Sequence, residues 1–150
     1  MRFSYRAYEV DSTPASGVED GRIYRPVVPF SLIGPNGLVD FFGLLDTGAD
    51  ESYITREMAE RLGLDLNDTS KYVIESAGGE VSVSYSDVVI EFGEGNEQYR
   101  WPVTIGITDQ EWSEAILGHS GFLQYFDVLF RGANREVMIT RNTKAMPSGS

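Results

Sequence analysis

The sequence predicts a mainly β protein with one or two short helices, built as a single domain. Aromatic residues and glycine are frequent, with eight Tyr, eight Phe and sixteen Gly, and 41% of the residues are hydrophobic. Segments in which apolar and polar residues alternate are separated by glycine-containing turn sequences, a pattern typical of antiparallel strands. A chain of 150 residues is long enough to bury one modest core.

The composition restricts the chemistry that such a domain can perform. The chain has no cysteine, which excludes disulfides, thiolate catalysis and Cys-based zinc sites, and its single histidine, His119, leaves no histidine cluster for a metal. A formal charge of −11 opposes binding to nucleic acid or to an anionic membrane surface. No apolar run has the length of a membrane span or of a signal-peptide core. Any catalysis must therefore use carboxylates, hydroxyls or His119, and we expect a cytoplasmic location.

The first quarter of the chain predicts two strands joined by a polar loop. Phe3–Val10 alternates loosely and is followed by a flexible segment over residues 11–21. Residues 22–33 continue the strand pattern, interrupted by Pro26 and Pro29. Proline removes a backbone donor, so we expect this strand to lie at a sheet edge or to carry a bulge.

The next strand delivers an aspartate to a tight turn. Gly34-Pro35-Asn36-Gly37 is a strong turn signal, and the apolar run Leu38–Leu45 then predicts a strand buried on both faces. Asp46 follows this strand directly, and Thr47-Gly48-Ala49 turns the chain away.

A short helix is predicted after a brief extended segment over residues 51–54. Thr55 is suited to the N-cap of a helix over Arg56–Leu62, and Gly63 supplies its stop. Three apolar residues fall on one face of this helix: Met58, Ala59 and Leu62.

The rest of the chain predicts hairpins around glycine-containing turns. Strands over residues 71–77 and 80–92 flank Gly78-Gly79, where glycine is free to take a positive φ. A loop over residues 64–70 is predicted before this hairpin. After the hairpin we expect, in order, a turn over 93–96, a strand over 99–107, a polar connection over 108–114, a buried strand over 115–117, a helical stretch over 120–125 and a hairpin of residues 126–130 and 136–139.

The order of these elements carries a family resemblance. An isolated Asp-Thr-Gly most often caps a turn. Here Leu44-Leu45-Asp46-Thr47-Gly48-Ala49 precedes a small helix, the glycine-tipped hairpin Tyr72–Tyr85, Ile116-Leu117-Gly118 and a helical stretch. This set resembles the retropepsin-like aspartic proteases and implies their closed, barrel-like fold. We expect a protease domain over residues 25–141, preceded by an extension over residues 1–24 with a strand and a flexible loop, and followed by a disordered tail over residues 142–150.

The resemblance implies an aspartic endopeptidase that needs no metal or cofactor. Peptide hydrolysis by aspartates requires two carboxylates that share one proton, so that one activates a water while the other protonates the scissile carbonyl oxygen. The sequence holds one Asp-Thr-Gly. A symmetric homodimer that brings together Asp46 of each subunit supplies the second carboxylate.

The resemblance also assigns roles to residues outside Asp46. It implies that Thr47 bonds across the dimer beneath the aspartates, and that Gly48 admits close backbone approach. It matches the hairpin Tyr72–Tyr85 to the flap that closes over a bound polypeptide. The residues expected to contact this substrate are Ala49 and Asp50 beside the turn, Ala77, Gly78 and Gly79 at the flap tip, and Trp112 and Ile116 as pocket walls.

Two departures from the retroviral pattern bear on the dimer. His119 stands where retroviral members usually carry an Arg that pairs with the acid matching Asp50. Either Asp50 has another partner, such as Arg131 or Arg141, or the interface is built differently. The chain also begins with about twenty extra residues, which form the interface, cover the cleft or serve as a self-cleaved leader.

Other functions are compatible with parts of the sequence. The same fold without the chemistry would be a catalytically silent dimerisation or peptide-binding module. A small β-barrel that binds a ligand, with Asp46 only capping its turn, predicts a monomer. A serine hydrolase built on His119 is disfavoured, because Gly118-His119-Ser120-Gly121 lacks the nucleophile-elbow pattern.

Overall fold

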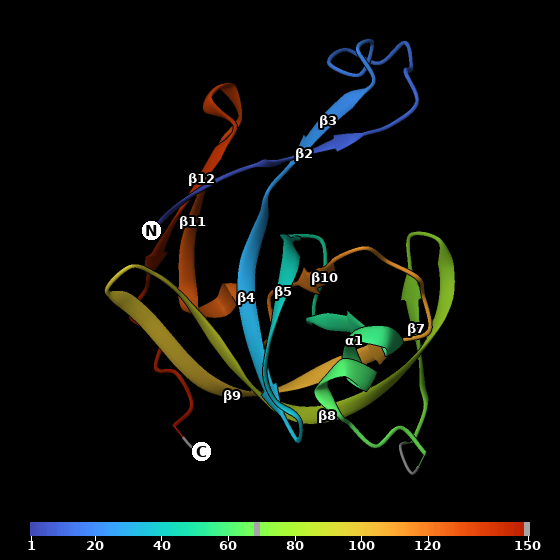
Figure 1. The fold of residues 1–150 in the computed structure, drawn as a ribbon, viewed down its shortest axis with the longest axis vertical. Coiled ribbons are helices and arrows are strands. Elements are labelled where there is room, and N and C mark those ends of the chain that lie inside the picture. Colours follow the sequence, from blue (N-terminus) through green and yellow to red (C-terminus); the bar gives the residue numbers. More distant parts are fainter. Residues whose placement is uncertain (68–69, 149–150) are drawn as a thin grey trace.

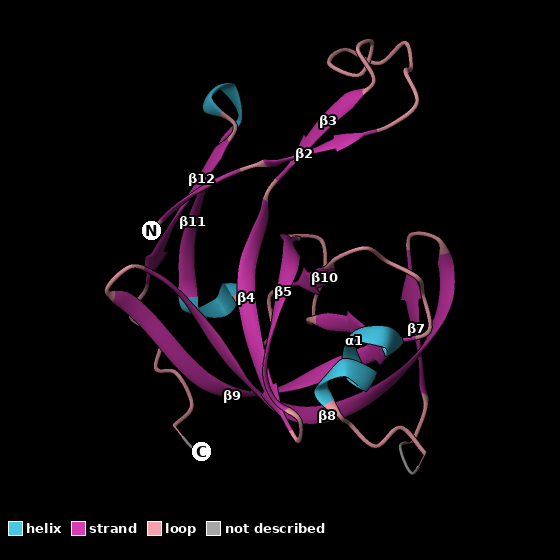
Figure 2. Ribbon diagram, in the orientation of Figure 1, coloured by secondary structure: helices cyan, strands magenta, loops and turns pink. Residues whose placement is uncertain are grey.

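The computed structural model describes residues 1–67 and 70–148, and strands dominate it (Figure 2). In these residues there is one α-helix, α1 (Arg56–Leu62), with two 3-10 turns, η1 (Leu123–Tyr125) and η2 (Gly132–Asn134). None of the described helices is long and apolar enough to cross a membrane. The strands are β1 (Arg2–Ser4), β2 (Arg6–Glu9), β3 (Arg22–Arg25), β4 (Val27–Gly34), β5 (Gly37–Leu45), β6 (Tyr53–Thr55), β7 (Tyr72–Ser76), β8 (Gly79–Glu94), β9 (Glu97–Thr108), β10 (Ala115–Leu117), β11 (Phe126–Arg131) and β12 (Glu136–Arg141).

The main sheet is a ring of hydrogen-bonded strands, which confirms the mainly β, closed fold. Its strand order is β4-β5-β10-β6-β9-β8-β7, and an additional pairing of β4 with β8 closes the ring. The long hairpin β8–β9 crosses the molecule (Figure 1), and its strand β8 also pairs with β4. Proline in β4 is tolerated because β8 pairs only with Ser31–Ile33, which leaves Pro29 on a part of the strand bonded on one side.

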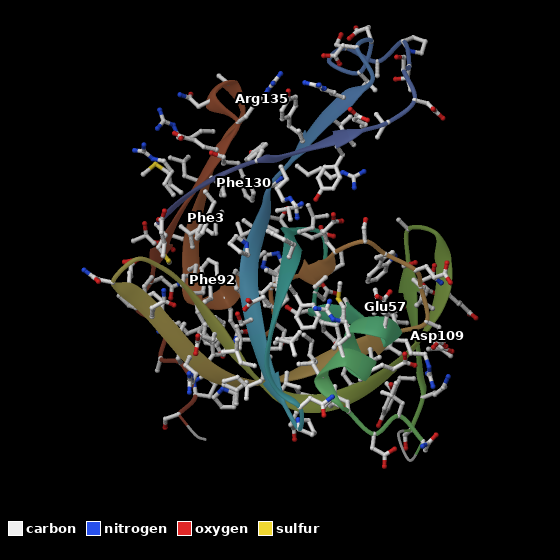
Figure 3. The ribbon with its side chains drawn as sticks, in the orientation of Figure 1. Phe3, Glu57, Phe92, Asp109, Phe130 and Arg135 are labelled. Carbon is white, nitrogen blue, oxygen red and sulfur yellow. The ribbon has the colours of Figure 1, made fainter. Side chains whose placement is uncertain are left out.

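The N-terminal residues form two strands instead of the single predicted strand Phe3–Val10. β1 joins β12 and β11 in a three-stranded sheet, whereas β2 pairs with β3 alone. The break falls at Tyr5, whose N–H donates to the Arg135 carbonyl at 2.8 Å. Phe3 anchors β1 to the core, with its ring 5.5 Å from that of Phe92 (Figure 3). The predicted strand over residues 22–33 is likewise divided, at Pro26, into β3 and β4.

The prediction that Leu38–Leu45 is buried on both faces is wrong. In β5 the side chains of Phe41 and Leu45 are buried, whereas Leu38 is 48% and Phe42 is 43% exposed. One face of the strand packs on the core and the other faces outward, where the Arg6 guanidinium lies 3.8 Å from the centre of the Phe42 ring. The apolar outer face is therefore covered in part by a cation instead of by a second layer.

The helix follows its local signals and closes one end of the ring. The Thr55 hydroxyl accepts a hydrogen bond from the Met58 N–H at 3.2 Å, and Gly63 ends the helix with a φ of 77°. Met58, Ala59 and Leu62 are buried as predicted. Thr55 and Gly63 satisfy backbone groups that a helix this short leaves unpaired at its ends.

The hairpins appear where the sequence places them, with different lengths. Strand β8 continues to Glu94, so the turn predicted over residues 93–96 shortens to Gly95-Asn96. The helical stretch predicted over residues 120–125 is the single turn η1. Residues 68–69 of the predicted loop and residues 149–150 of the predicted tail lie outside the described residues.

Glycine at position 43 allows β5 and β10 to approach closely. A Cβ atom there would lie 2.6 Å from Leu117 Cδ1 and 3.0 Å from Phe30 Cε1. We predict that Gly43→Ala lowers the free energy of unfolding by about 1–3 kcal/mol, because the extra methyl overpacks a buried contact. Urea denaturation measures this loss. Gly132→Ala is the control, since a Cβ there meets no atom within 4 Å, and should change stability by less than about 0.5 kcal/mol. Equal stability of the two variants would contradict this account of the packing.

Candidate active site

Asp46 is held at the end of β5 by its own turn and by β10. Strand β10 runs parallel to β5, with Leu117 opposite Leu45, and the Asp46 N–H donates to the Leu117 carbonyl at 3.1 Å. Within the turn, the Gly48 N–H donates to Asp46 Oδ1 at 2.9 Å, and the Ala49 N–H donates to the Asp46 carbonyl at 3.2 Å. One carboxylate oxygen of the half-buried Asp46 side chain is thus held by a single backbone donor, the Gly48 N–H.

Behind this turn, Ser52 and Gly118 connect the segment that follows the Asp46 turn to the segment that follows β10. The buried Ser52 hydroxyl donates to the Ser120 carbonyl and accepts from the Gly118 N–H, both at 3.0 Å. A Cβ at position 118 would lie 2.1 Å from the Glu51 carbonyl oxygen and 2.7 Å from that of Ala49, so only glycine fits. Sequence analysis missed Ser52, because a serine between Glu51 and Tyr53 carries no signal of a partner 66 residues away.

His119 contacts the Asp46 turn through both its side chain and its backbone. Its Nε2 lies 2.7 Å from the Thr47 carbonyl oxygen, and its backbone N–H donates to the Ala49 carbonyl at 3.0 Å. A carbonyl only accepts, so Nε2 carries the proton.

The arginines suggested as partners of Asp50 lie elsewhere. Arg131 donates to Glu136 at 2.9 Å, and Arg141 donates to the Tyr125 carbonyl at 2.8 Å. Within the described residues the Asp50 side chain therefore pairs with neither of them, and its carbonyl accepts from the Ser120 N–H at 2.8 Å.

A groove of about 870 Å³ extends from Asp46 to the hairpin β7–β8. An apolar cluster of Tyr53, Val81 and Val83 forms its floor, with Ile116 packed against this cluster. Trp112 is 37% exposed and stands edge-on to Tyr53, with ring centres 6.4 Å apart. The predicted residues that line the groove are Asp46, Gly48, Ala49, Asp50, Ala77, Gly78, Trp112 and Ile116.

Two predicted residues do not line this groove. Thr47 is exposed and presents its carbonyl to His119. Gly79 begins β8 with a φ of 113°, a conformation that favours glycine. Of the two tip glycines, it alone takes a positive φ, as predicted for the hairpin tip.

Tyr53 lines the groove and Tyr85 packs against its apolar cluster, and neither was predicted from the sequence to be a site residue. Burial, followed by a hydrogen bond to the Glu51 carboxylate, raises the pKa of Tyr85 well above its usual value. Burial, followed by the charges of Glu51 and Asp50, raises the pKa of Tyr53. Both phenols therefore remain protonated near neutral pH. Among the residues described, no cluster of three or more His, Cys, Asp or Glu is arranged to hold a metal ion.

Comparisons with known proteins agree with this geometry. The family model described as aspartyl protease matches residues 28–120, which include the Asp46 turn, the hairpin and Gly118. No curated protein sequence matches the chain significantly.

Two solved structures are similar to this chain. A retropepsin-like aspartic protease from Rickettsia conorii is 19% identical with a TM-score of 0.54, over 90% of this chain and 98% of that one. The EIAV protease complexed with the inhibitor HBY-793 is 26% identical with a TM-score of 0.45, over 63% of this chain and 82% of that one.

The Rickettsia structure shows the shared fold, and the family model spans the turn on which Asp46 is presented to the groove. This chain therefore belongs to the aspartyl protease family and has a retropepsin-like fold.

Proposed function

We propose that the active enzyme is a homodimer that hydrolyses polypeptides with one Asp46 from each subunit. The observation that carries this proposal is that the chain holds one Asp-Thr-Gly, and its aspartate lines a groove large enough for several residues of an extended peptide. Two carboxylates at close range cannot both ionise cheaply, so the pair holds one proton. Two-fold symmetry supplies the second carboxylate without a second motif.

The geometry of Asp46 suits this chemistry. The Gly48 N–H fixes Oδ1, and we place the shared proton between the two Oδ2 atoms. The ionised member of the pair takes a proton from the attacking water, while the protonated member donates to the scissile carbonyl oxygen. The roles of Thr47 at the dimer axis and of Gly48 in close backbone approach are part of this proposal.

A free strand edge supports the dimer. In the order β1-β12-β11, strand β11 is the outer strand of the three-stranded sheet, and its Leu129 and Phe130 are 57% and 38% exposed. The hairpins β2–β3 and β11–β12 project past the end of β5 that leads to Asp46 (Figure 1). Because β1 already pairs with β12 of the same chain, we assign the β11 edge to the contact between subunits.

The hairpin β7–β8 is proposed as the flap. Ala77 and Gly78 at its tip line the groove, and a Cβ added at Gly78 or Gly79 would meet no atom within 4 Å. Its outer residues Tyr72 and Val73 are also largely exposed. A hairpin with so few contacts at its tip can close over a peptide, exclude water and offer backbone groups to an extended chain.

A catalytically silent dimerisation or peptide-binding module is the alternative. Such a module would keep the groove and the dimer, and the Asp46 side chain would only stabilise its own turn. The intact turn and its backbone donors favour the enzyme. A cytoplasmic location stays a prediction from the sequence.

Removal of the Asp46 charge separates these functions. We predict that Asp46→Asn lowers peptide cleavage by at least about a hundredfold, because the pair loses its general base. Cleavage of a diverse peptide mixture from about pH 4 to about pH 7, read by mass spectrometry, measures this. Sedimentation of the same variant checks that the dimer persists. Equal cleavage by the wild type and by Asp46→Asn would contradict the proposed mechanism. A wild-type dimer that cleaves no peptide would favour the silent module.

The proposed interface predicts that Leu129→Glu weakens the dimer. Placing a charge where an apolar side chain becomes buried should raise the dimer Kd by roughly tenfold or more, and should make specific activity depend on protein concentration. Analytical ultracentrifugation measures the Kd. Leu38→Glu is the matched control, since Leu38 is 48% exposed at the opposite end of β5 from Asp46. A similar Kd for both variants would show that the β11 edge is not the interface.

The His119 contact predicts a positioning role. His119→Phe removes the donor to the Thr47 carbonyl and should lower kcat by roughly tenfold to a hundredfold, because the catalytic turn is no longer held. His119→Gln places an amide N–H near the Nε2 position and should restore most of kcat. Steady-state kinetics with thermal melts of each variant measure this. If Phe and Gln variants had the same kcat, the hydrogen bond would have no positioning role.

A further inference from the structure

We infer that Tyr8, on the N-terminal hairpin β2–β3, is a positioning residue for the substrate groove. Through Glu114 it fixes the connection over residues 109–114, which carries Trp112 in the groove wall. The inference rests on the proposed function and deepens it, because it names residues outside the groove that set how tightly the groove binds a peptide. It also gives the N-terminal extension a role in the folded protein that a leader removed by cleavage would not have.

Trp112 lies between two strands, in a segment of irregular backbone. Strand β9 ends at Thr108 and β10 begins at Ala115, and the residues between them lack the ladder of backbone hydrogen bonds that fixes a strand. The Trp112 side chain lines the groove and meets Tyr53 edge-on, with ring centres 6.4 Å apart. The position of this part of the groove wall therefore depends on what holds the two ends of the connection.

The start of the connection is held by ion pairs on the surface. The Asp109 carboxylate lies 3.5 Å from Arg56 and 3.3 Å from Lys71. All three side chains are about half exposed, and ion pairs this exposed contribute little because water screens them. The end of the connection, which is nearer to Trp112, needs a support of its own.

This end faces a tyrosine of the N-terminal extension. The Tyr8 Oη atom is buried, and among the described residues it makes no hydrogen bond of full geometry. Burial, followed by the adjacent Glu114 carboxylate, raises the pKa of Tyr8 to about 12, so the phenol keeps its proton. A buried hydroxyl is costly to leave unpaired, and a carboxylate is a strong acceptor. Its partner in solution is therefore Glu114, whose contact with the Ser113 hydroxyl leaves acceptor capacity.

The hairpin β2–β3 can serve as a support because cations fix it to the rest of the protein. On one face, the Arg6 guanidinium lies 3.8 Å from the centre of the Phe42 ring on β5. On the other face, Arg135 from the turn between β11 and β12 lies 3.6 Å from the centre of the Tyr24 ring. Stacking of a guanidinium on an aromatic ring stabilises a contact most where water is excluded. The hairpin is thus held from both sides.

Strand pairing brings the two contacts of the inner face to neighbouring positions. In the parallel pair of β5 with β10, β10 begins opposite Gly43, so Glu114, just before β10, lies beside Phe42. On β2, Arg6 and Tyr8 are two residues apart and point to the same face. The hairpin therefore meets β5 through Arg6 and the end of the connection through Tyr8.

The accessibility of Trp112 tests whether the hairpin holds the connection. The chain has two tryptophans, and Trp101 is fully buried, so quenching of tryptophan fluorescence by acrylamide reports on Trp112. We expect Tyr8→Phe to raise the quenching constant by roughly twofold, because the connection is released. Tyr24→Phe is the matched control, since it removes a hydroxyl from the same hairpin on the face that Arg135 covers, and it should leave the constant unchanged.

Steady-state kinetics test whether the connection matters for substrate binding, with a fluorogenic peptide chosen from those that the wild type cleaves. Tyr8→Phe should raise KM by roughly threefold to tenfold and change kcat by less than about twofold, because the groove wall binds the peptide without taking part in the chemistry. Tyr24→Phe should have wild-type KM. An unchanged KM, or a loss confined to kcat, would overturn the inference.

Variants of Glu114 test the pair directly. Glu114→Ala should raise KM and Trp112 quenching as Tyr8→Phe does, and the double variant should be no worse than either single variant, because both remove the same contact. Glu114→Gln keeps an acceptor and should stay near the wild type. Effects of Tyr8→Phe and Glu114→Ala that simply add, or an equal effect of Tyr24→Phe, would overturn the inference.

The quenching measurement separates failure of this inference from failure of the proposed function, because it requires no activity. If the wild type cleaves no peptide, higher quenching in Tyr8→Phe and its non-additivity with Glu114→Ala still support the hold of the hairpin on Trp112. If the wild type is an active protease and Tyr8→Phe leaves quenching unchanged, the inference is wrong while the proposed function stands.

Discussion

The parallel pairing of β5 with β10 is the constraint on which the site depends. It brings Leu117 beside Leu45 and supplies the carbonyl that holds the Asp46 N–H. The pairing is close because Gly43 and Gly118 leave room where a Cβ would collide with Leu117 or with backbone carbonyls. Two segments separated by a helix and two hairpins in the sequence thus become one support for the carboxylate that we propose as catalytic, which is how a domain with few helices positions a reactive group.

Locally encoded features were predictable from the sequence. Thr55 and Gly63 define the helix because capping depends on neighbouring residues, and the hairpin β7–β8 follows its glycine tip. The turn at Asp46 was identified from its motif and from the order of elements around it, and the residues that the family model matches include this turn. Most of the groove residues were predicted from the family resemblance, because spacing in the sequence alone does not bring Trp112 and Ile116 beside the turn.

Features that depend on distant partners were not predictable. The sequence predicts that the outward face of β5 is part of the core, because Phe42 is as apolar as Phe41. The Arg6 side chain that covers Phe42 lies on another strand. The split of the N-terminal segment at Tyr5 depends on a carbonyl from the β11–β12 turn. Ser52 and Tyr85 act through partners that their neighbours do not indicate. Tertiary contacts decided each of these cases.

His119 supports the Asp46 turn through a hydrogen bond to the Thr47 carbonyl, and it needs no positive charge to do so. Imidazole donates through Nε2 both as the neutral Nε2–H tautomer and as the cation. An aspartic protease changes the ionisation of its carboxylates as it works, and this support places no permanent positive charge beside them.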